Sequence, residues 1–348
     1  MKRGARRVSL MLLVLLSVGI LGWSFLVWTP PPMPLPNPNG YDDLIKAAQA
    51  VAGKIDDATE LEHEGLRTLI TTNAEALRLL RIGLSRRCAV PTDSHIANFE
   101  TVVMGDLIGL KRLAKLLSAE GRLAEIENRP SDAARSYTDA IHLGRQISRG
   151  GLMIHRLVGI ACEGLVSKPL PAVLPKLTCE QLTSLAAELE GIDHSTVLWR
   201  EVLQNEKRFA RADTGDFEYP IALVSSWWRA RSIRRGVQEK HEVASARLRL
   251  LTVEVALRSY KCRQGRAAET LAQLTPKYLR SAPIDPFSGK PLIYRLSGTN
   301  WVLYSLGPDR KNDGGKPLGT TSENHFLVFG SARAGTTDKG DLLYDSKW

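Results

Sequence analysis

Histidines beside carboxylates are the residues of this chain that could do catalytic chemistry. His63-Glu64 begins like the zinc motif H-E-x-x-H, but the position of the second histidine is Arg67, so the motif is incomplete. Asp93-Ser94-His95 is more typical of a helix cap than of a loop site. His142 and His155 stand in apolar helical stretches, which is typical of core histidines. The sequence contains no nucleophile elbow, phosphate loop or dinucleotide fingerprint. We therefore expect no enzyme; a membrane-tethered hydrolase around His63 or His95 is the alternative.

A second group of residues could bind a surface. Two tryptophans precede an arginine-rich stretch, namely Trp227, Trp228, Arg229, Arg231, Arg234 and Arg235. Indoles at headgroup depth and guanidiniums on phosphates are typical of a membrane surface, whereas packing between two domains explains the tryptophans equally well. The net charge of +10 is spread along the chain and comes with no recognition motif, so we do not expect nucleic acid as a partner. Binding to the envelope or another anionic surface is an alternative function.

The amino-terminal stretch predicts a membrane anchor. Val8–Trp28 holds no charge and no proline, and about 21 helical residues span a ~30 Å hydrocarbon core. The cluster Lys2, Arg3, Arg6 and Arg7 precedes it, which keeps the amino terminus in the cytoplasm. A cleaved signal peptide is the alternative, but its apolar core would be shorter. We predict a single-pass protein of a bacterial inner membrane, with residues 1–28 as the cytoplasmic tip and anchor, and the rest extracytoplasmic, or periplasmic.

The next stretch, Thr29–Gly40, is rich in proline, which cannot continue a helix. We expect a semi-extended spacer that lifts the rest of the chain off the membrane. An extracytoplasmic location permits disulfides, and the four cysteines are spaced too widely for a zinc site. One disulfide, two disulfides and buried thiols all remain open, with three full pairings among Cys88, Cys162, Cys179 and Cys262.

Helical periodicity dominates residues 41–205. One apolar stripe in this region is Leu107, Leu110, Leu113 and Leu117, and Gly121 is a candidate end of its helix. Asn128–Asp132 reads as a break in which Ser131 or Asp132 caps the next helix. That helix resembles the second half of a tetratricopeptide-type hairpin, on the spacing of Ala134, Tyr137, Ala140 and Ile141. No regular 34-residue period follows, so the pattern predicts a helical bundle or an irregular helical repeat.

The carboxy-terminal region predicts a second domain, 237–348, behind an aromatic and arginine-rich connector at 206–236. A helix with a wide apolar face runs from Val237 to Tyr260 or Arg263, Gly265 ends it, and a short helix follows at Glu269–Leu274. Two strands, Leu292–Leu296 and Trp301–Ser305, form a hairpin around Ser297-Gly298. The predicted fold class is therefore multidomain, α followed by α+β.

This last third of the chain resembles the globular part of the major pseudopilin (the protein G type) of type II secretion systems. The resemblance rests on Ala256-Leu257 with Tyr260, on Gly265-Arg266, on the stretch from Pro283 to Tyr294 (P-x-D-P-F-x-G-x-P-x-x-Y), and on S-L-G-x-D at Ser305–Asp309. It implies a long helix packed on a small antiparallel sheet.

The resemblance also implies a calcium ion, held by the Leu306 carbonyl, Asp309, Asp313 and a late aspartate such as Asp341. Calcium takes six to eight oxygen ligands, which an Asp-, Asn- and Gly-rich loop can supply. A solvated turn, in which Asp and Gly merely permit the backbone conformation, is the alternative.

The amino terminus departs from the pseudopilin pattern. Gly4 is followed by Ala5, and Ser9 stands where that family has a glutamate. The apolar segment is also far from the domain's helix, so we expect neither processing nor polymerisation. The sequence thus predicts a non-enzymatic, membrane-anchored scaffold or interaction protein. Its partner would be another protein, for instance in a secretion or pilus-like assembly.

Overall fold

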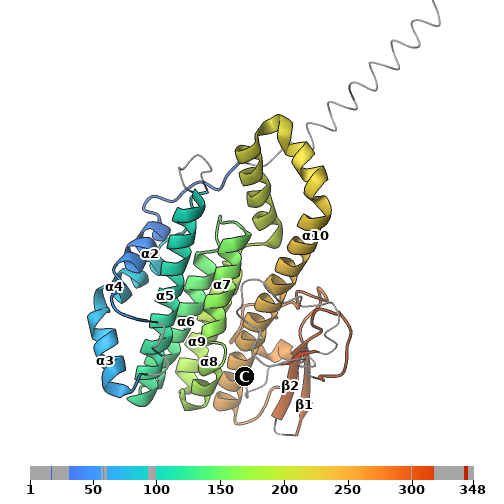
Figure 1. The fold of residues 1–348 in the computed structure, drawn as a ribbon. Helices are drawn as coiled ribbons and strands as arrows, with labels where there is room; N and C mark the ends of the chain where they lie inside the picture. The colour runs from blue at the N-terminus through green and yellow to red at the C-terminus, as the bar shows by residue number, and fades with distance from the viewer. Residues whose placement is uncertain are drawn as a thin grey trace, which may run out of the picture.

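The computed structural model of the chain describes residues 17, 31–55, 58, 61–92, 99–298, 300–316 and 341–343 (Figure 1). For residues 99 and 215–230 it describes the backbone only. The predicted anchor, apart from Ser17, and Asp93-Ser94-His95 lie outside the described residues.

The amino-terminal two thirds form a bundle of helices that lie side by side (Figure 1). The leucines at heptad-like spacing, such as Leu110, Leu113 and Leu117, are fully buried between them, which confirms the predicted helical region. The elements are α2 (Gly40–Gln49), α3 (His63–Thr72), α4 (Ala74–Ser85), α5 (Phe99–Ile126), α6 (Pro130–Gln146), α7 (Met153–Leu165), α8 (Pro169–Val173), the 3-10 turn η1 (Leu174–Lys176) and α9 (Cys179–His194).

Two helix boundaries differ from the predictions. Helix α5 continues through Gly121, where a Cβ atom would stand 2.2 Å from the Tyr137 ring, so the glycine is there for close packing rather than to end the helix. Helix α6 begins at Pro130 behind Arg129, without the side-chain cap expected from Ser131 or Asp132. Proline fits the first helical turn because its missing N–H would have no partner there.

One described stretch, Met153–Lys176, is long and apolar enough to cross a membrane by length and composition. It comprises α7, α8 and η1, and over half of its most apolar window is buried within the protein. A core helix passes the same test, so the finding is weak evidence for a span.

Helix α10 (Trp199–Gln264) is continuous by backbone hydrogen bonding but folds back on itself (Figure 1). Its first arm begins at Trp199, and its second arm runs from Arg231 to Gln264. The rings of Trp199 and His241 lie 5.8 Å apart, whereas a straight helix would separate these residues by roughly 60 Å. Pro220, which removes a backbone donor, lies in the stretch between the arms. The predicted helix start at Val237 is therefore wrong, because residues 206–236 are also helical. The predicted end is correct, since Gly265 follows with φ of +69°.

The carboxy-terminal module contains a sheet with strand order β1 (Ile293–Ser297), β2 (Asn300–Ser305) and β3 (Leu342–Leu343). The predicted hairpin is confirmed: β1 and β2 pair antiparallel, with Ser297 opposite Asn300. Strand β3, which no strand pattern predicts, adds Leu342 opposite Ser305. The short helix predicted at Glu269–Leu274 is a 3-10 turn, η2 (Leu271–Leu274).

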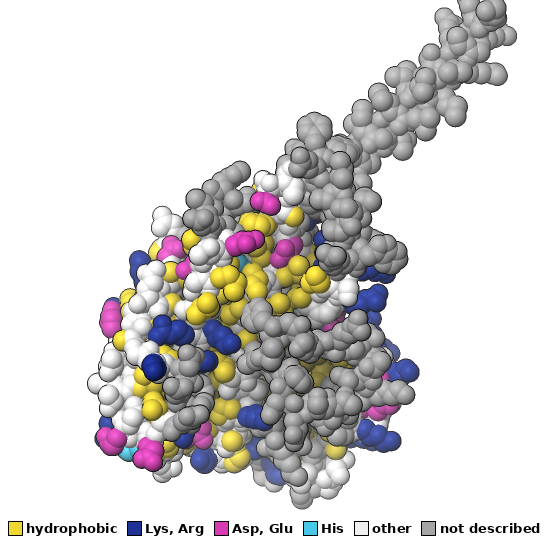
Figure 2. All heavy atoms as spheres, viewed as in Figure 1, with side chains coloured by type: hydrophobic (Ala, Val, Ile, Leu, Met, Phe, Trp, Pro, Cys, Tyr) yellow, Lys and Arg dark blue, Asp and Glu magenta, His cyan; other side chains and the backbone are white. Residues whose placement is uncertain are grey.

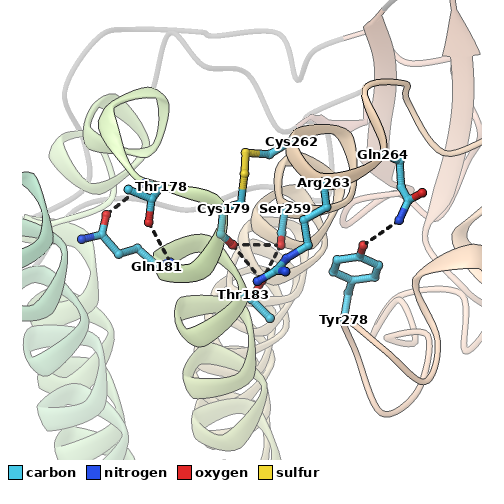
Figure 3. The surroundings of a disulfide bond; sticks show 9 residues. All are labelled: Thr178, Cys179, Gln181, Thr183, Ser259, Cys262, Arg263, Gln264 and Tyr278. Atoms are coloured by element: carbon cyan, nitrogen blue, oxygen red, sulfur yellow. Dashed lines mark hydrogen bonds between the residues drawn. A yellow bond between two sulfur atoms is a disulfide. The ribbon is translucent and has the colours of Figure 1, made fainter.

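A disulfide joins Cys179 at the start of α9 to Cys262 at the end of α10 (Figure 3). Beside it, the hydroxyls of Thr183 and Ser259 lie 2.7 Å apart. Cys88 and Cys162 are buried free thiols. Of the arrangements left open by the sequence, the structure therefore has the one with a single disulfide.

The module also docks on α9 through two acidic side chains. Glu190 accepts the Arg280 amide at 2.8 Å, and Asp193 accepts Arg249 Nε at 2.9 Å. The same Arg249 donates to the Ile284 carbonyl at 2.6 Å, so α9 holds both the long helix and the loop before the sheet.

Candidate functional site

Asp285 joins the two halves of the pseudopilin-like signature. Its carboxylate, 1% exposed, accepts the Ser305 hydroxyl at 2.7 Å, the Phe287 amide at 3.1 Å and the Leu306 amide at 3.2 Å. The D-P-F turn therefore holds the start of the S-L-G-x-D loop. The D-P-F and S-L-G-x-D motifs therefore belong together structurally, because Asp285 of the first binds Ser305 and Leu306 of the second.

The aspartate loop, Leu306–Lys316 together with Asp341, is shaped by residues with positive φ at Gly307, Arg310, Gly314 and Gly315. Short polar side chains cap its turns: Asp309 accepts the Lys311 amide, and Asn312 accepts the Gly314 amide, both at 3.0 Å. The Asp and Gly residues thus permit the backbone conformation, as the solvated-turn alternative expects.

Asp341 is more than a turn residue, because its side chain is fully buried. One of its oxygens accepts the Gly315 amide at 2.7 Å, while Oδ1 has no hydrogen-bond partner among the described residues. Burial raises the pKa of this carboxyl, the backbone amides of Gly315 and Asp313 oppose the rise, and the charges of Asp313 and Asp309 add to it. Asp313 Oδ2 is likewise buried without a described partner. Buried carboxylate oxygens without partners are costly unless a cation neutralises them.

These orphaned oxygens fit a calcium ion, which prefers carboxylate and carbonyl ligands. Three of the predicted ligands, Asp309, Asp313 and Asp341, are close enough to interact electrostatically. No three His, Cys, Asp or Glu side chains already stand in a metal-binding arrangement in the part of the chain that is described. If calcium binds, it would hold the loop to the segment that carries β3.

A second group of charges, the buried arginine cluster, lies between α6, α7 and the second arm of α10. It consists of Arg145, Arg156, Glu163 and His241. Glu163 accepts Arg145 Nη2 at 2.8 Å and Arg156 Nη1 at 2.7 Å, and both arginine side chains are 1% exposed. Arg156 Nε also donates to His241 Nδ1 at 3.0 Å, so this histidine nitrogen must be unprotonated.

The electrostatics of this cluster keep His241 neutral. Burial and the neighbouring guanidiniums, Arg156 first, lower the pKa of His241 to about 2. Burial lowers the pKa of Arg145 to about 10, which leaves it charged at neutral pH. One glutamate therefore faces two buried guanidiniums. Within the described chain, Arg145 Nε and Arg156 Nη2 have no hydrogen-bond partner.

Sequence reasoning missed this cluster, although α7 carries a signal for it. Arg156 and Glu163 are charges in the most apolar helix of the bundle and lie seven residues apart, which places them two turns apart on one face. The partners Arg145 and His241 come from distant segments, so no local pattern points to them.

The histidines singled out for catalysis are dispersed. His63 lies in an exposed ion-pair network, where Glu127 is 3.2 Å from His63 Nε2 and 2.8 Å from Arg67 Nη2. His142 contacts Gln146, and burial lowers the pKa of His142. His155 is fully buried and receives the Leu152 amide, and burial lowers its pKa to about 4. The described histidines therefore form no common site, and the hydrolase alternative around His95 stays untested.

The predicted surface-binding arginines lie where α10 folds back. The side chains of Trp227, Trp228 and Arg229 lie outside the described residues. Arg231 and Arg235 are exposed, and Ile233 between them is 55% exposed. Arg234 is half-buried. Burial raises the pKa of Glu206 on the first arm, and the charge of Arg234 opposes that rise.

Comparison of the chain with protein-family models, with curated proteins and with solved structures finds no match. The pseudopilin-like and tetratricopeptide-like resemblances therefore stay predictions.

Proposed function

We propose that this chain is a non-enzymatic scaffold of a bacterial inner membrane, anchored by Val8–Trp28, with its folded part on the extracytoplasmic, or periplasmic, side. The apolar length of that segment and the basic residues before it support the anchor. The disulfide between Cys179 and Cys262 supports the compartment, because disulfides persist in oxidising surroundings.

The observation that carries the proposal is the contact at the start of the proline-rich linker. Arg208 Nη2, on the first arm of α10, donates to the Pro31 carbonyl at 3.0 Å. Two residues separate Pro31 from Trp28, so an extended chain reaches about 10 Å from the end of the apolar segment to this contact. On this proposal the linker holds the bundle close to the membrane, whereas its composition predicts a spacer that lifts the bundle off it.

The same end of the molecule exposes apolar side chains on the first turns of α5, where Val102, Met104 and Ile108 are 42–58% exposed. Figure 1 shows the start of α5 and the fold-back of α10 at one end of the bundle. Hydrophobic side chains gather over the upper half of the face shown in Figure 2. Apolar side chains and arginines together are typical of a surface that rests on lipid headgroups.

The carboxy-terminal module lies at the opposite end (Figure 1). The second arm of α10, from Arg231 to Gln264, spans about 50 Å at 1.5 Å per residue. The disulfide and the contacts of Glu190 and Asp193 fix the module to the bundle. We propose that the protein presents this module, with a calcium ion held by Leu306, Asp309, Asp313 and Asp341, to a protein partner. The pseudopilin resemblance favours a secretion or pilus-like assembly as the source of that partner.

Membrane extraction together with a topology reporter tests the anchor and the compartment. We expect the full chain to stay in the membrane fraction after alkaline carbonate treatment, and a reporter fused after Trp348 to be active outside the cytoplasm. Deletion of residues 8–28 should release the protein from the membrane. Recovery of the intact chain in the soluble fraction, or a reporter active in the cytoplasm, would overturn the proposal.

A further inference from the structure

The two ends of the disulfide between Cys179 and Cys262 differ in exposure. Cys262 is exposed, as are the residues from Arg263 to Arg266 that follow it, whereas Cys179 is half-buried. A thiolate reduces a disulfide by direct attack on one of its sulfurs, so the more accessible sulfur is the site of attack. Exposed disulfides are typically the labile or regulatory ones. The position of this bond therefore permits exchange at Cys262 without unfolding of the bundle.

Cys179 is suited to be the leaving group because it is the first residue of helix α9. Thr178 caps this helix: its hydroxyl accepts the Gln181 amide at 3.3 Å, and the Gln181 side chain accepts the Thr178 amide at 2.9 Å. The positive end of a helix stabilises a thiolate in the first turn. Glu180 in the same turn is exposed, so solvent screens its opposing charge. Attack at Cys262 thus expels the sulfur that holds a negative charge better.

A guanidinium lies beside the bond as well. Arg263 is exposed and directly follows Cys262. Its Nε donates to the Thr183 hydroxyl at 3.4 Å (Figure 3). That hydroxyl in turn donates to the Cys179 carbonyl at 2.8 Å. The charge of Arg263 is therefore close to both cysteines, where it attracts an incoming thiolate and stabilises the departing one.

The contacts beside the disulfide are hydroxyl contacts. Thr183 and Ser259 are 2.7 Å apart, and Ser259 also donates to the Cys179 carbonyl at 3.4 Å (Figure 3). Neutral hydrogen bonds of this kind contribute less to stability than a disulfide does. Farther along α9, the contacts of Glu190 and Asp193 with the module do not depend on the bond. Loss of the disulfide should therefore loosen the end of α10 and the turn η2 behind it while the module stays docked.

We propose that this disulfide is an exchange site for a dithiol. In the first step a thiolate of the dithiol forms a bond with Cys262 Sγ, the bond between the two cysteines breaks, and Cys179 leaves as a thiolate. In the second step the other sulfur of the dithiol attacks its partner in the mixed disulfide and releases Cys262. The dithiol is oxidised to a disulfide, and two electrons and two protons pass to the two cysteines. The inference is independent of the scaffold function, because it needs neither the anchor nor a calcium ion.

Reduction of the full chain in lipid nanodiscs by dithiothreitol tests the exchange, with reduced Cys179 and Cys262 measured by alkylation and mass spectrometry. We expect a rate that is proportional to the dithiol concentration and changes less than about twofold in urea below the unfolding transition, because direct attack exposes little buried surface. A bond that opens only on unfolding would instead be reduced about tenfold faster per molar urea. Acceleration of that size, or no reduction before the protein unfolds, would overturn the proposal.

A thioredoxin whose second active-site cysteine is replaced by serine traps the first step as a stable mixed disulfide. We expect the adduct on Cys262 about ten times as often as on Cys179, because the exposed sulfur is attacked and the sulfur at the helix start leaves. Peptide mapping after acid quenching measures the ratio. An adduct mainly on Cys179 would contradict the proposed direction of exchange.

Variants of Arg263 test the role of the guanidinium. Arg263→Gln should slow the reduction about threefold at low salt, whereas Arg263→Lys keeps the charge and should retain the rate. Arg266→Gln is the matched control, because Arg266 is also exposed but pairs with Glu269, and its loss should leave the rate unchanged. Equal rates in the two glutamine variants would contradict the role assigned to Arg263.

Discussion

The aspartate loop brings carboxylates together, and the buried arginine cluster brings two guanidiniums to one carboxylate, but the chain builds the two sites differently. The loop takes Asp309 and Asp313 from one turn-rich stretch and adds Asp341, which the β3 segment brings to it. The cluster takes its members from three helices, and its longest hydrogen bond in sequence joins Arg145 to the Ala244 carbonyl, 99 residues away. A loop near the surface can recruit a cation from solvent after folding. A helical interior must balance its charges as it packs.

Replacement of Glu163 by glutamine should have the largest effect on stability. The substitution leaves Arg145 and Arg156 buried without their common carboxylate, and breaking such a buried pair costs about 3–5 kcal/mol. Denaturant unfolding of the full chain in detergent measures the loss as a lower midpoint. Glu75→Gln is the control, because the Glu75–Arg78 pair is exposed on α4 and its loss should leave the midpoint unchanged. Equal midpoints for the two variants would show that the cluster is not a stabilising unit.

Removal of the disulfide should allow the carboxy-terminal module to unfold before the helical bundle does. The bond between Cys179 and Cys262 closes a loop of 83 residues, and disulfides across loops of this kind typically contribute about 2–4 kcal/mol. The double variant Cys179→Ser, Cys262→Ser should unfold at lower denaturant, with the module losing hydrogen-exchange protection before the bundle does. The free thiols supply the control: Cys162→Ala should lower the stability of the bundle without uncoupling the module. Loss of protection in both regions together would mean that α10 alone couples them.

The comparison also shows what the sequence can and cannot predict. The hairpin and the end of α10 at Gly265 follow from local patterns, and the structure confirms them. The loop of Asp309 and Asp313 was singled out by the pseudopilin resemblance, which stays a prediction. The fold-back of α10 was not predictable, because helical periodicity continues through its backbone and only tertiary contacts such as Trp199 with His241 reveal it.

The roles of single residues were harder to predict than the elements that carry them. Gly121 looked like a helix end but makes room for Tyr137. Asp285, which the sequence marks only as part of the P-x-D-P-F motif, accepts hydrogen bonds from Ser305 and Leu306. In each case the partner comes from a different element, so the sequence gives the residue type but not the contact that explains it.

Asp341→Asn should change stability in opposite directions with and without calcium. The folded-state pKa of Asp341 is raised, so the folded protein holds this proton more tightly than the unfolded chain. The corresponding stability is fully present below the unfolded pKa near 3.9 and is lost as pH rises through the folded pKa. In chelator at neutral pH the charged carboxyl therefore destabilises the loop, and the neutral asparagine should match or exceed the wild type.

With calcium the order should reverse. Ligand at about 100 times its dissociation constant stabilises the folded state by about 2.7 kcal/mol, and the asparagine variant should lose most of this gain. Thermal melts of the full chain in calcium and in chelator measure both effects. Asp213→Asn, an exposed carboxyl on the first arm of α10, should respond to calcium as the wild type does. A calcium shift that persists in the Asp341 variant would place the ion elsewhere, and no shift in any protein would leave the aspartate loop as a turn.

Neutralising the arginines at the fold-back of α10 should have the smallest effect, because these side chains are exposed. Each arginine near an anionic lipid surface contributes about 1 kcal/mol, and salt screens it. A fluorophore at Ile233→Cys should be quenched by headgroup-labelled lipids in anionic nanodiscs, whereas one at Leu296→Cys in β1 should not be, since the sheet lies at the other end of the molecule (Figure 1). Adding Arg231→Gln and Arg235→Gln should reduce the quenching at 233 in anionic but not in neutral lipid. Equal quenching at 233 and 296 would mean that neither end is held against the membrane, even if the chain remains anchored.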